Sequence, residues 1–368
     1  MGSETTRAAA WSSSSEGSGK PVSGWGVVTA PLYAVRPPAP AAAARPAAGP
    51  RNGMGLRPAW CGNLESMNNR QKQQTRPAPR RRPGHSPYLF WLGAGLCAAA
   101  FAFNYYALVR TTTGQFADES AWAEAEAGWS FGRGVFLDFL DLLPDVSAAV
   151  AAVVLVVVAL VRRRWKAAGI AVGVVLASAA TTWILKNLIL DRPDRGVPTL
   201  EHNSLPSGHT TIAAAAALAV FLVVSPRWRP FAAAAGGAYA VLAGSATLIN
   251  GWHRPSDVVA AFLVAGFWAL LAGPAVLRSG DAWNDFRGYG SHWSSSPVWP
   301  RLCWLLALLG LALAAGLYWV VQQVGAAPVP GSGRLPLFFW AGMALILGCG
   351  MLMSALLTWL FSSQTRRR

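Results

Sequence analysis

Charged side chains are scarce in this sequence. Only 13% of its 368 residues are Asp, Glu, Lys or Arg, which is about half the share usual in soluble globular domains. Apolar residues make up 53% of the chain, and the mean hydropathy is +0.34. This composition argues against a soluble protein and indicates an integral membrane protein.

Cysteine is also scarce, with four residues and no CxxC pair. Cys97, Cys303 and Cys349 lie inside apolar stretches, and Cys61 lies in the N-terminal segment. A disulfide framework or a zinc site is recognised by regular cysteine spacing, so neither is expected.

Acidic residues are few, 16 against 31 basic ones, which leaves a net charge of +15. In a soluble protein such an excess suggests nucleic-acid binding. Here the arginines stand in short clusters between apolar stretches, the positive-inside pattern of a protein with several membrane spans. No nucleic-acid partner is expected, because a basic groove needs its cations on one surface. The clusters are Arg80–Arg82, Arg162–Arg164, Arg227 with Arg229, and Arg366–Arg368.

Residues 1–84 are rich in Ser, Gly, Pro, Ala and Arg and have no sustained apolar period. Such a segment buries too little apolar surface to fold, so it predicts a disordered basic tail. No apolar stretch before Tyr88 is long enough for a signal peptide. Met54 and Met67 stay open as alternative starts.

From Tyr88 onward, eight apolar segments approach the ~20 residues that cross a bilayer, which predicts an all-α integral membrane fold. Segments 146–161 and 209–224 are short, so they are expected to extend into flanking residues such as 140–145. The eight segments are 88–109, 146–161, 167–190, 209–224, 231–249, 257–277, 301–322 and 336–361.

The charge pattern also predicts an orientation. With the tail inside, the basic clusters agree on the cytoplasmic side, and both termini of a multi-pass cell-membrane protein lie there. The acidic segment 118–126 is then an outer loop. The outer segments 186–208 and 247–257 carry ionisable residues against the charge bias, and such residues at a membrane boundary indicate function.

The first of these motifs contains Lys186 and Arg192-Pro193. The two cations are about one and a half helical turns apart, so they can converge on an anion at the end of the third span. The alternative is a snorkelling lysine beside an ordinary loop arginine.

The second motif is Pro206-Ser207-Gly208-His209, directly before an apolar run. A hydroxyl and free backbone N–H groups at a helix start favour an anion, and His209 can reach the leaving oxygen of a ligand. Alternatively, Ser207 is an ordinary N-cap and His209 a boundary histidine.

The third motif places His253 four residues before Asp257. One helical turn brings the carboxylate to the imidazole, where it fixes the tautomer and leaves the other ring nitrogen nucleophilic. A metal pair is the rival interpretation, but no further cluster of His, Cys or carboxylates completes a ligand set.

Together and in this order, the three motifs resemble the signature of the type 2 phosphatidic acid phosphatase (PAP2) superfamily: Lys-x6-Arg-Pro, Pro-Ser-Gly-His and Ser-Arg-x5-His-x3-Asp. The resemblance covers residues 140–278. It implies a six-helix PAP2-like catalytic core over residues 85–278. Two extra C-terminal transmembrane helices and a basic end then follow over residues 279–368.

The resemblance also implies roles for single residues. Lys186 and Arg192 would bind phosphate oxygens, and Ser207 and the Gly208 amide would complete the phosphate-binding site.

In the same comparison, His253 would attack phosphorus, Asp257 would orient it, and His209 would protonate the leaving alkoxide. No metal or other cofactor is implied, because cationic side chains and amides stabilise the phosphoryl charge.

Two departures stand out. Five residues rather than six separate Lys186 from Arg192, which makes Arg195 an alternative phosphate ligand. The family arginine before the nucleophile is replaced by Thr247, which supplies a hydrogen bond but no charge. Arg254 is the candidate replacement for that phosphate-binding cation.

The expected function is a metal-independent membrane lipid phosphatase that forms a phosphohistidine on the extracytoplasmic side. Phosphatidic acid, phosphatidylglycerol phosphate and a polyprenyl diphosphate all fit as substrates. The alternative is a catalytically impaired lipid-binding or transport protein on the same scaffold. The persistence of His209, His253 and Asp257 favours the enzyme. The oligomeric state is left open.

Overall fold

A computed structural model describes residues 86–128, 133–197, 203–280, 284, 288–290, 292–324 and 336–365. The predicted N-terminal tail, the cluster Arg80–Arg82 and the cluster Arg366–Arg368 lie outside these residues. The described part of the chain is helical and contains no strand, which confirms the predicted all-α fold.

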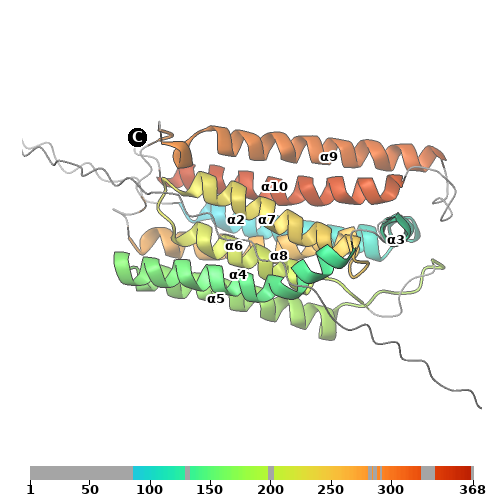
Figure 1. The fold of residues 1–368 in the computed structure, drawn as a ribbon, viewed down its shortest axis with the longest axis horizontal. Coiled ribbons are helices and arrows are strands. Elements are labelled where there is room, and N and C mark those ends of the chain that lie inside the picture. Colours follow the sequence, from blue (N-terminus) through green and yellow to red (C-terminus); the bar gives the residue numbers. More distant parts are fainter. Residues whose placement is uncertain are drawn as a thin grey trace, which may run out of the picture. The chain divides into compact units, whose positions relative to one another are not determined.

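Each of the eight predicted spans coincides with one helix, and most of these helices run side by side in Figure 1. Two of them continue into a short π-helical turn, named η1 and η2. The helices are α2 (Tyr88–Asn104) with η1 (Tyr105–Val109), α4 (Arg133–Arg162), α5 (Trp165–Ile184) with η2 (Leu185–Ile189), α6 (Gly208–Val223), α7 (Arg229–Ile249), α8 (Pro255–Arg278), α9 (Val298–Val324) and α10 (Leu337–Thr365).

Seven of these helices are long and apolar enough to cross a membrane, whereas α6 is shorter. The predicted extension of the second span holds, since its apolar stretch begins at Leu140. The fourth span does not extend: α6 has 16 residues, which rise about 24 Å against a hydrocarbon core of about 30 Å. Pro206 and Pro226 flank α6, and proline disfavours continuation of a helix. The prediction of eight full-length spans is therefore corrected to seven and a short, central α6.

The acidic segment 118–126 is a helix and not a loop, which corrects the prediction for this region. It belongs to α3 (Thr112–Gly128), seen end-on in Figure 1 while the other helices run across the view. Alanine recurs through this segment, which favours a helix. Asp118, Glu119 and Glu124 are buried, so these three acidic side chains face the protein rather than water, whereas Glu126 is exposed.

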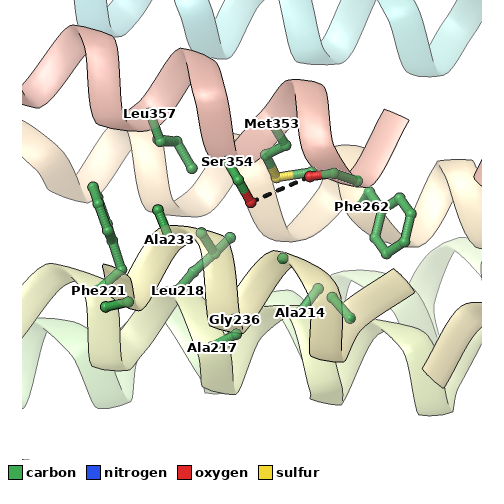
Figure 2. A pocket seen from close by; sticks show the side chains of 14 residues that line it. Ala214, Ala217, Leu218, Phe221, Ala233, Gly236, Phe262, Met353, Ser354 and Leu357 are labelled. Carbon is green, nitrogen blue, oxygen red and sulfur yellow. Dashed lines mark hydrogen bonds between the residues drawn. The ribbon is translucent and has the colours of Figure 1, made fainter. Parts of the chain in front are cut away.

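Small residues let α10 pack closely on α7. A Cβ atom added to Gly237 would lie 2.2 Å from Oγ of Ser354. Figure 2 shows the neighbouring space, a void of about 20 Å³ lined by α6, α7, α8 and α10, with the Ser354 Oγ–Gly350 O hydrogen bond at 3.3 Å. The N–H of Phe339 on α10 also donates to Glu124 Oε2 at 2.8 Å. Of the two extra C-terminal helices, α10 therefore packs into the helix bundle.

Candidate active site

Three segments that are distant in the sequence meet at one end of the bundle. Lys186 lies in η2, His209 in the first turn of α6, and His253 just before α8. The ring of His209 lies 5.2 Å from that of Trp252, the neighbour of His253. Asn203 Nδ2 donates to the carbonyls of Lys186 and Leu205 at 3.3 and 3.1 Å, which joins η2 to the segment before α6. The N–H of Ser207 donates to the carbonyl of Asp257 at 3.0 Å, which holds the start of α6 against the first turn of α8. The structure thus brings the three sequence motifs together.

Asp257 is fully buried and contacts the imidazole of His253. Its Oδ2 atom lies 3.2 Å from Nδ1 of His253. The same oxygen accepts hydrogen bonds from Ser204 Oγ at 2.6 Å and from the Arg254 N–H at 3.1 Å. Pro255 occupies the first turn of α8, and Arg254 and Asp257 form its capping box. Asp257 therefore contacts the Nδ1 side of the His253 ring, and Nε2 lies on the other side of the ring.

Ser207 is the N-cap of α6. Its hydroxyl is fully buried, accepts from the Thr210 N–H at 3.4 Å and donates to Thr210 Oγ1 at 3.0 Å. By contrast, no atom lies within 4 Å of a Cβ built on Gly208, so there is open space beside that residue. Half-buried His209 lies beside Trp252, with ring centroids 5.2 Å apart and the rings tilted by 43°. An anion at this helix start would therefore meet Gly208 and His209 first.

The two arginines are buried among carboxylates. Arg192, whose side chain is 1% exposed, lies 3.3 Å from Glu119 Oε1 and 3.5 Å from both Asp118 Oδ2 and Asp257 Oδ1. Arg254, also 1% exposed, forms an ion pair through Nε with Glu119. Both guanidinium groups therefore face carboxylates rather than open space in this structure.

Comparison with known families agrees with this arrangement. Residues 186–280, from Lys186 to just beyond α8, match the family model described as the PAP2 superfamily. The chain carries a PAP2 superfamily domain. No curated protein and no solved structure matches the chain. The match covers η2 to α8 and leaves α3, α9 and α10 outside the family signature.

The carboxylates of α3 contact the PAP2 domain, and the sequence reasoning missed their role. Asp118 accepts from the Ser256 N–H at 3.0 Å and from Ser256 Oγ at 2.5 Å. Gln115 Nε2 donates to the Pro193 carbonyl at 2.7 Å. Gln115, Asp118 and Glu119 have the i, i+3, i+4 spacing of one helix face. That spacing is the signal of this face in the sequence, although the charge pattern alone predicts an outer loop here.

Burial also changes the acidity of Asp118. It raises the pKa of this carboxyl, and the nearby charge of Asp257 raises it further. The guanidinium of Arg192 and the hydrogen bonds from Ser256 act in the opposite direction. Asp118 therefore holds its proton more tightly than an exposed carboxyl does.

Two further candidate phosphate ligands, Thr247 and Arg195, are not part of this network of arginines and carboxylates. Thr247 is fully buried, and its hydroxyl donates to the Gly244 carbonyl at 2.7 Å. The Thr247 carbonyl accepts from the Trp252 and His253 N–H groups at 3.0 and 3.2 Å, so Thr247 shapes the turn before α8. Arg195 is exposed in the loop after η2. No group of three or more metal-ligating side chains occurs among the described residues.

Proposed function

We propose that the PAP2 domain hydrolyses a phosphate monoester or diphosphate of a membrane lipid through a phosphohistidine on His253. The observation that carries this proposal is the hydrogen bond between His253 and buried Asp257, beside His209 and the open space at Gly208. In this proposal the chain is a metal-independent phosphoric ester or diphosphate hydrolase.

In the first step, Nε2 of His253 forms a bond to phosphorus as the bond to the leaving lipid oxygen breaks. His209 gives its proton to that oxygen. In the second step, water attacks phosphorus, loses a proton to His209, and releases inorganic phosphate and free His253. Lys186 and the N–H groups at the start of α6 stabilise the phosphoryl oxygens.

A groove farther along the same helices supports a lipid substrate. It has a volume of about 360 Å³ and is lined almost entirely by apolar side chains of α4, α6 and α7, with the hydrogen-bonded pair Ser147 and Tyr239 as its polar members. Tyr239 also packs in the cluster that contains Trp252, the neighbour of His209. On α6 the groove begins at Ala216, about 10 Å along the helix from His209. A phosphate at His209 would leave a hydrocarbon tail beside this groove.

The charge distribution supports an extracytoplasmic site. Arg162–Arg164 and Arg227 with Arg229 lie at the ends of helices opposite to Lys186, His209 and His253. By the positive-inside rule the basic end is cytoplasmic. In this proposal both termini lie inside, and the headgroup of an outer-leaflet lipid reaches the site.

A second candidate function rests on the buried arginines. Since Arg192 and Arg254 are paired with carboxylates and Thr247 carries no charge, fewer cations face a bound phosphate than the family signature supplies. A lipid phosphate-binding protein with weak or no turnover would have this property.

Phosphate release by the purified protein distinguishes the two candidates. The substrates are phosphatidic acid, phosphatidylglycerol phosphate and a polyprenyl diphosphate, each with EDTA and with or without vanadate. The phosphatase proposal expects release that survives EDTA and is blocked by vanadate, which resembles five-coordinate phosphorus. Binding of these lipids without release would support the second candidate, and release only after a divalent ion is added would refute metal independence.

A further inference from the structure

Glu119 on α3 contacts both arginines of the site. Its Oε1 atom lies 3.3 Å from Nη1 of Arg192 and forms an ion pair with Nε of Arg254, and its side chain is 7% exposed. Glu119 lies outside residues 186–280, the segment that matches the PAP2 superfamily. The family signature therefore assigns no role to this carboxylate.

The two arginines lead from Glu119 to Asp257. Arg192 Nη2 lies 3.5 Å from Asp257 Oδ1. Arg254 Nη1 donates to Ser204 Oγ at 2.8 Å, and Ser204 Oγ donates to Asp257 Oδ2 at 2.6 Å. The guanidinium of Arg192 thus contacts the carboxylate that binds Nδ1 of His253, and the guanidinium of Arg254 reaches the same carboxylate through Ser204.

The charges of this network suit the nucleophile better than they suit phosphate. The carboxylates of Asp118, Glu119 and Asp257 face the guanidinium groups of Arg192 and Arg254. Above the raised pKa of Asp118 all five groups are ionised and one negative charge is left over, which disfavours an anion. It favours the positive charge that an imidazole acquires when its Nε2 bonds to phosphorus while Nδ1 keeps its proton.

We propose that Glu119 is a positioning residue for His253. It holds Arg192 and Arg254 against Asp257 and Ser204, so that Asp257 keeps the imidazole in its nucleophilic orientation. Glu119 then supports the nucleophile from α3, a helix that precedes the PAP2 segment in the chain. This inference rests on the phosphatase activity proposed above.

The test is Glu119→Gln, which keeps the length of the side chain and removes its charge. kcat for a short-chain phosphatidic acid should fall about 10- to 100-fold, the scale of a charged hydrogen bond or of a small misplacement of a reacting group. KM should stay within about threefold of wild type, because the substrate does not touch Glu119. The single-turnover rate of His253 phosphorylation should fall in parallel with kcat.

Glu124→Gln is the matched control. Glu124 is buried on the same helix, but its Oε2 accepts from the Phe339 N–H, away from the arginines. Glu124→Gln can lower the thermal stability of the protein. Its kcat, counted only for the molecules whose His253 can be phosphorylated, should match that of wild type. Equal losses of kcat in the two variants would show that α3 acts only through folding and would overturn the proposal.

Other outcomes are equally decisive. A lower KM, or tighter vanadate inhibition, in Glu119→Gln would show that the carboxylate competes with phosphate for the arginines, and positioning would be wrong. If Glu119→Gln does not fold, Arg192→Lys replaces it, with a fall in kcat and unchanged KM expected. A rise in KM with kcat kept would instead make Arg192 a direct phosphate ligand.

Failure of the inference is distinguishable from failure of the proposed function. A wild-type protein that releases no phosphate from any lipid refutes the phosphatase itself. A wild-type protein that turns over, with a Glu119→Gln variant that keeps its kcat, refutes only the role of Glu119.

Discussion

Nδ1 of His253 lies 3.2 Å from Oδ2 of Asp257, a fully buried carboxylate oxygen that also accepts hydrogen bonds from Ser204 Oγ and from the Arg254 N–H. Three donors on one oxygen stabilise the ionised carboxylate. They also fix its direction, because two donors come from the turn before α8 and the third, Ser204, comes from the segment before α6. The position of the imidazole is therefore determined by the fold around α8 and not by the His253 side chain alone.

His253→Ala should abolish turnover and the acid-labile phosphoenzyme. Asp257→Asn should keep the fold but lower the rate of phosphoenzyme formation by about two to four orders of magnitude, because the amide no longer holds the reactive tautomer. Both are measured with a phosphorus-32-labelled lipid. Ser204→Ala, which removes one of three donors to Asp257, is the matched control and should cost only about tenfold. Activity of more than a few per cent in His253→Ala would refute its assignment as nucleophile.

The sequence was most informative where one local pattern decides the structure. The apolar segments predicted the helices, and the His253-x3-Asp257 spacing predicted a contact that the first turn of α8 forms. Pairing between distant segments was not predictable. Nothing near Arg192 indicates that Asp118 and Glu119 approach it, since the ion pairs depend on how α3 crosses the end of the bundle.

The length of α6 shows a second limit. Hydropathy predicts that the short segment 209–224 extends into flanking residues, but α6 stops at Val223, with Pro226 close behind. Helices α4, α5, α7 and α8 pack around α6. Burial by protein removes the need to match the bilayer thickness, and composition alone does not reveal that burial.

The orientation proposed above predicts opposite labelling at the two ends of the bundle. A cysteine at exposed Arg195, on a background without the native cysteines, should react with a membrane-impermeant maleimide in intact cells. A cysteine at exposed Arg227, in the α6–α7 connection, should react only after permeabilisation. The reverse pattern would place the site in the cytoplasm and contradict the proposed access from the outer leaflet.

The raised pKa of Asp118 predicts a particular dependence of stability on pH. Because burial raises the pKa above its ordinary value of 3.8, the folded protein binds this proton more tightly than the unfolded chain does. The contribution of Asp118 to the free energy of unfolding is thus greatest below that value and is lost as pH rises through the raised pKa. In the wild-type protein, this contribution should lower the Tm as pH rises from about 4 to about 7.

Asp118→Asn should remove this component and flatten the dependence of Tm on pH over the same range. The matched control is Asp194→Asn, since Asp194 is exposed in the loop after η2. It should leave the pH dependence as in wild type. An unchanged slope in Asp118→Asn would mean that Asp118 does not retain its proton in the folded protein.

The groove between α4, α6 and α7 predicts selectivity for chain length. Ala235 lines the groove and is exposed, so Ala235→Trp should fill the groove without disturbing the core. A lipid tail that moves from the bilayer into this groove is already out of water, so it gains packing contacts but no hydrophobic free energy. The effect of the substitution on kcat/KM should therefore be moderate. kcat/KM for a long-chain lipid phosphate should fall about tenfold, the scale of one or two lost methylene contacts. A short-chain phosphate that does not reach Ala216 should be hydrolysed as by wild type.

Ala238→Trp is the matched control, because Ala238 is exposed on the same helix but does not line the groove. Equal losses for long and short chains in Ala235→Trp, or the same selective loss in Ala238→Trp, would show that the tail lies elsewhere.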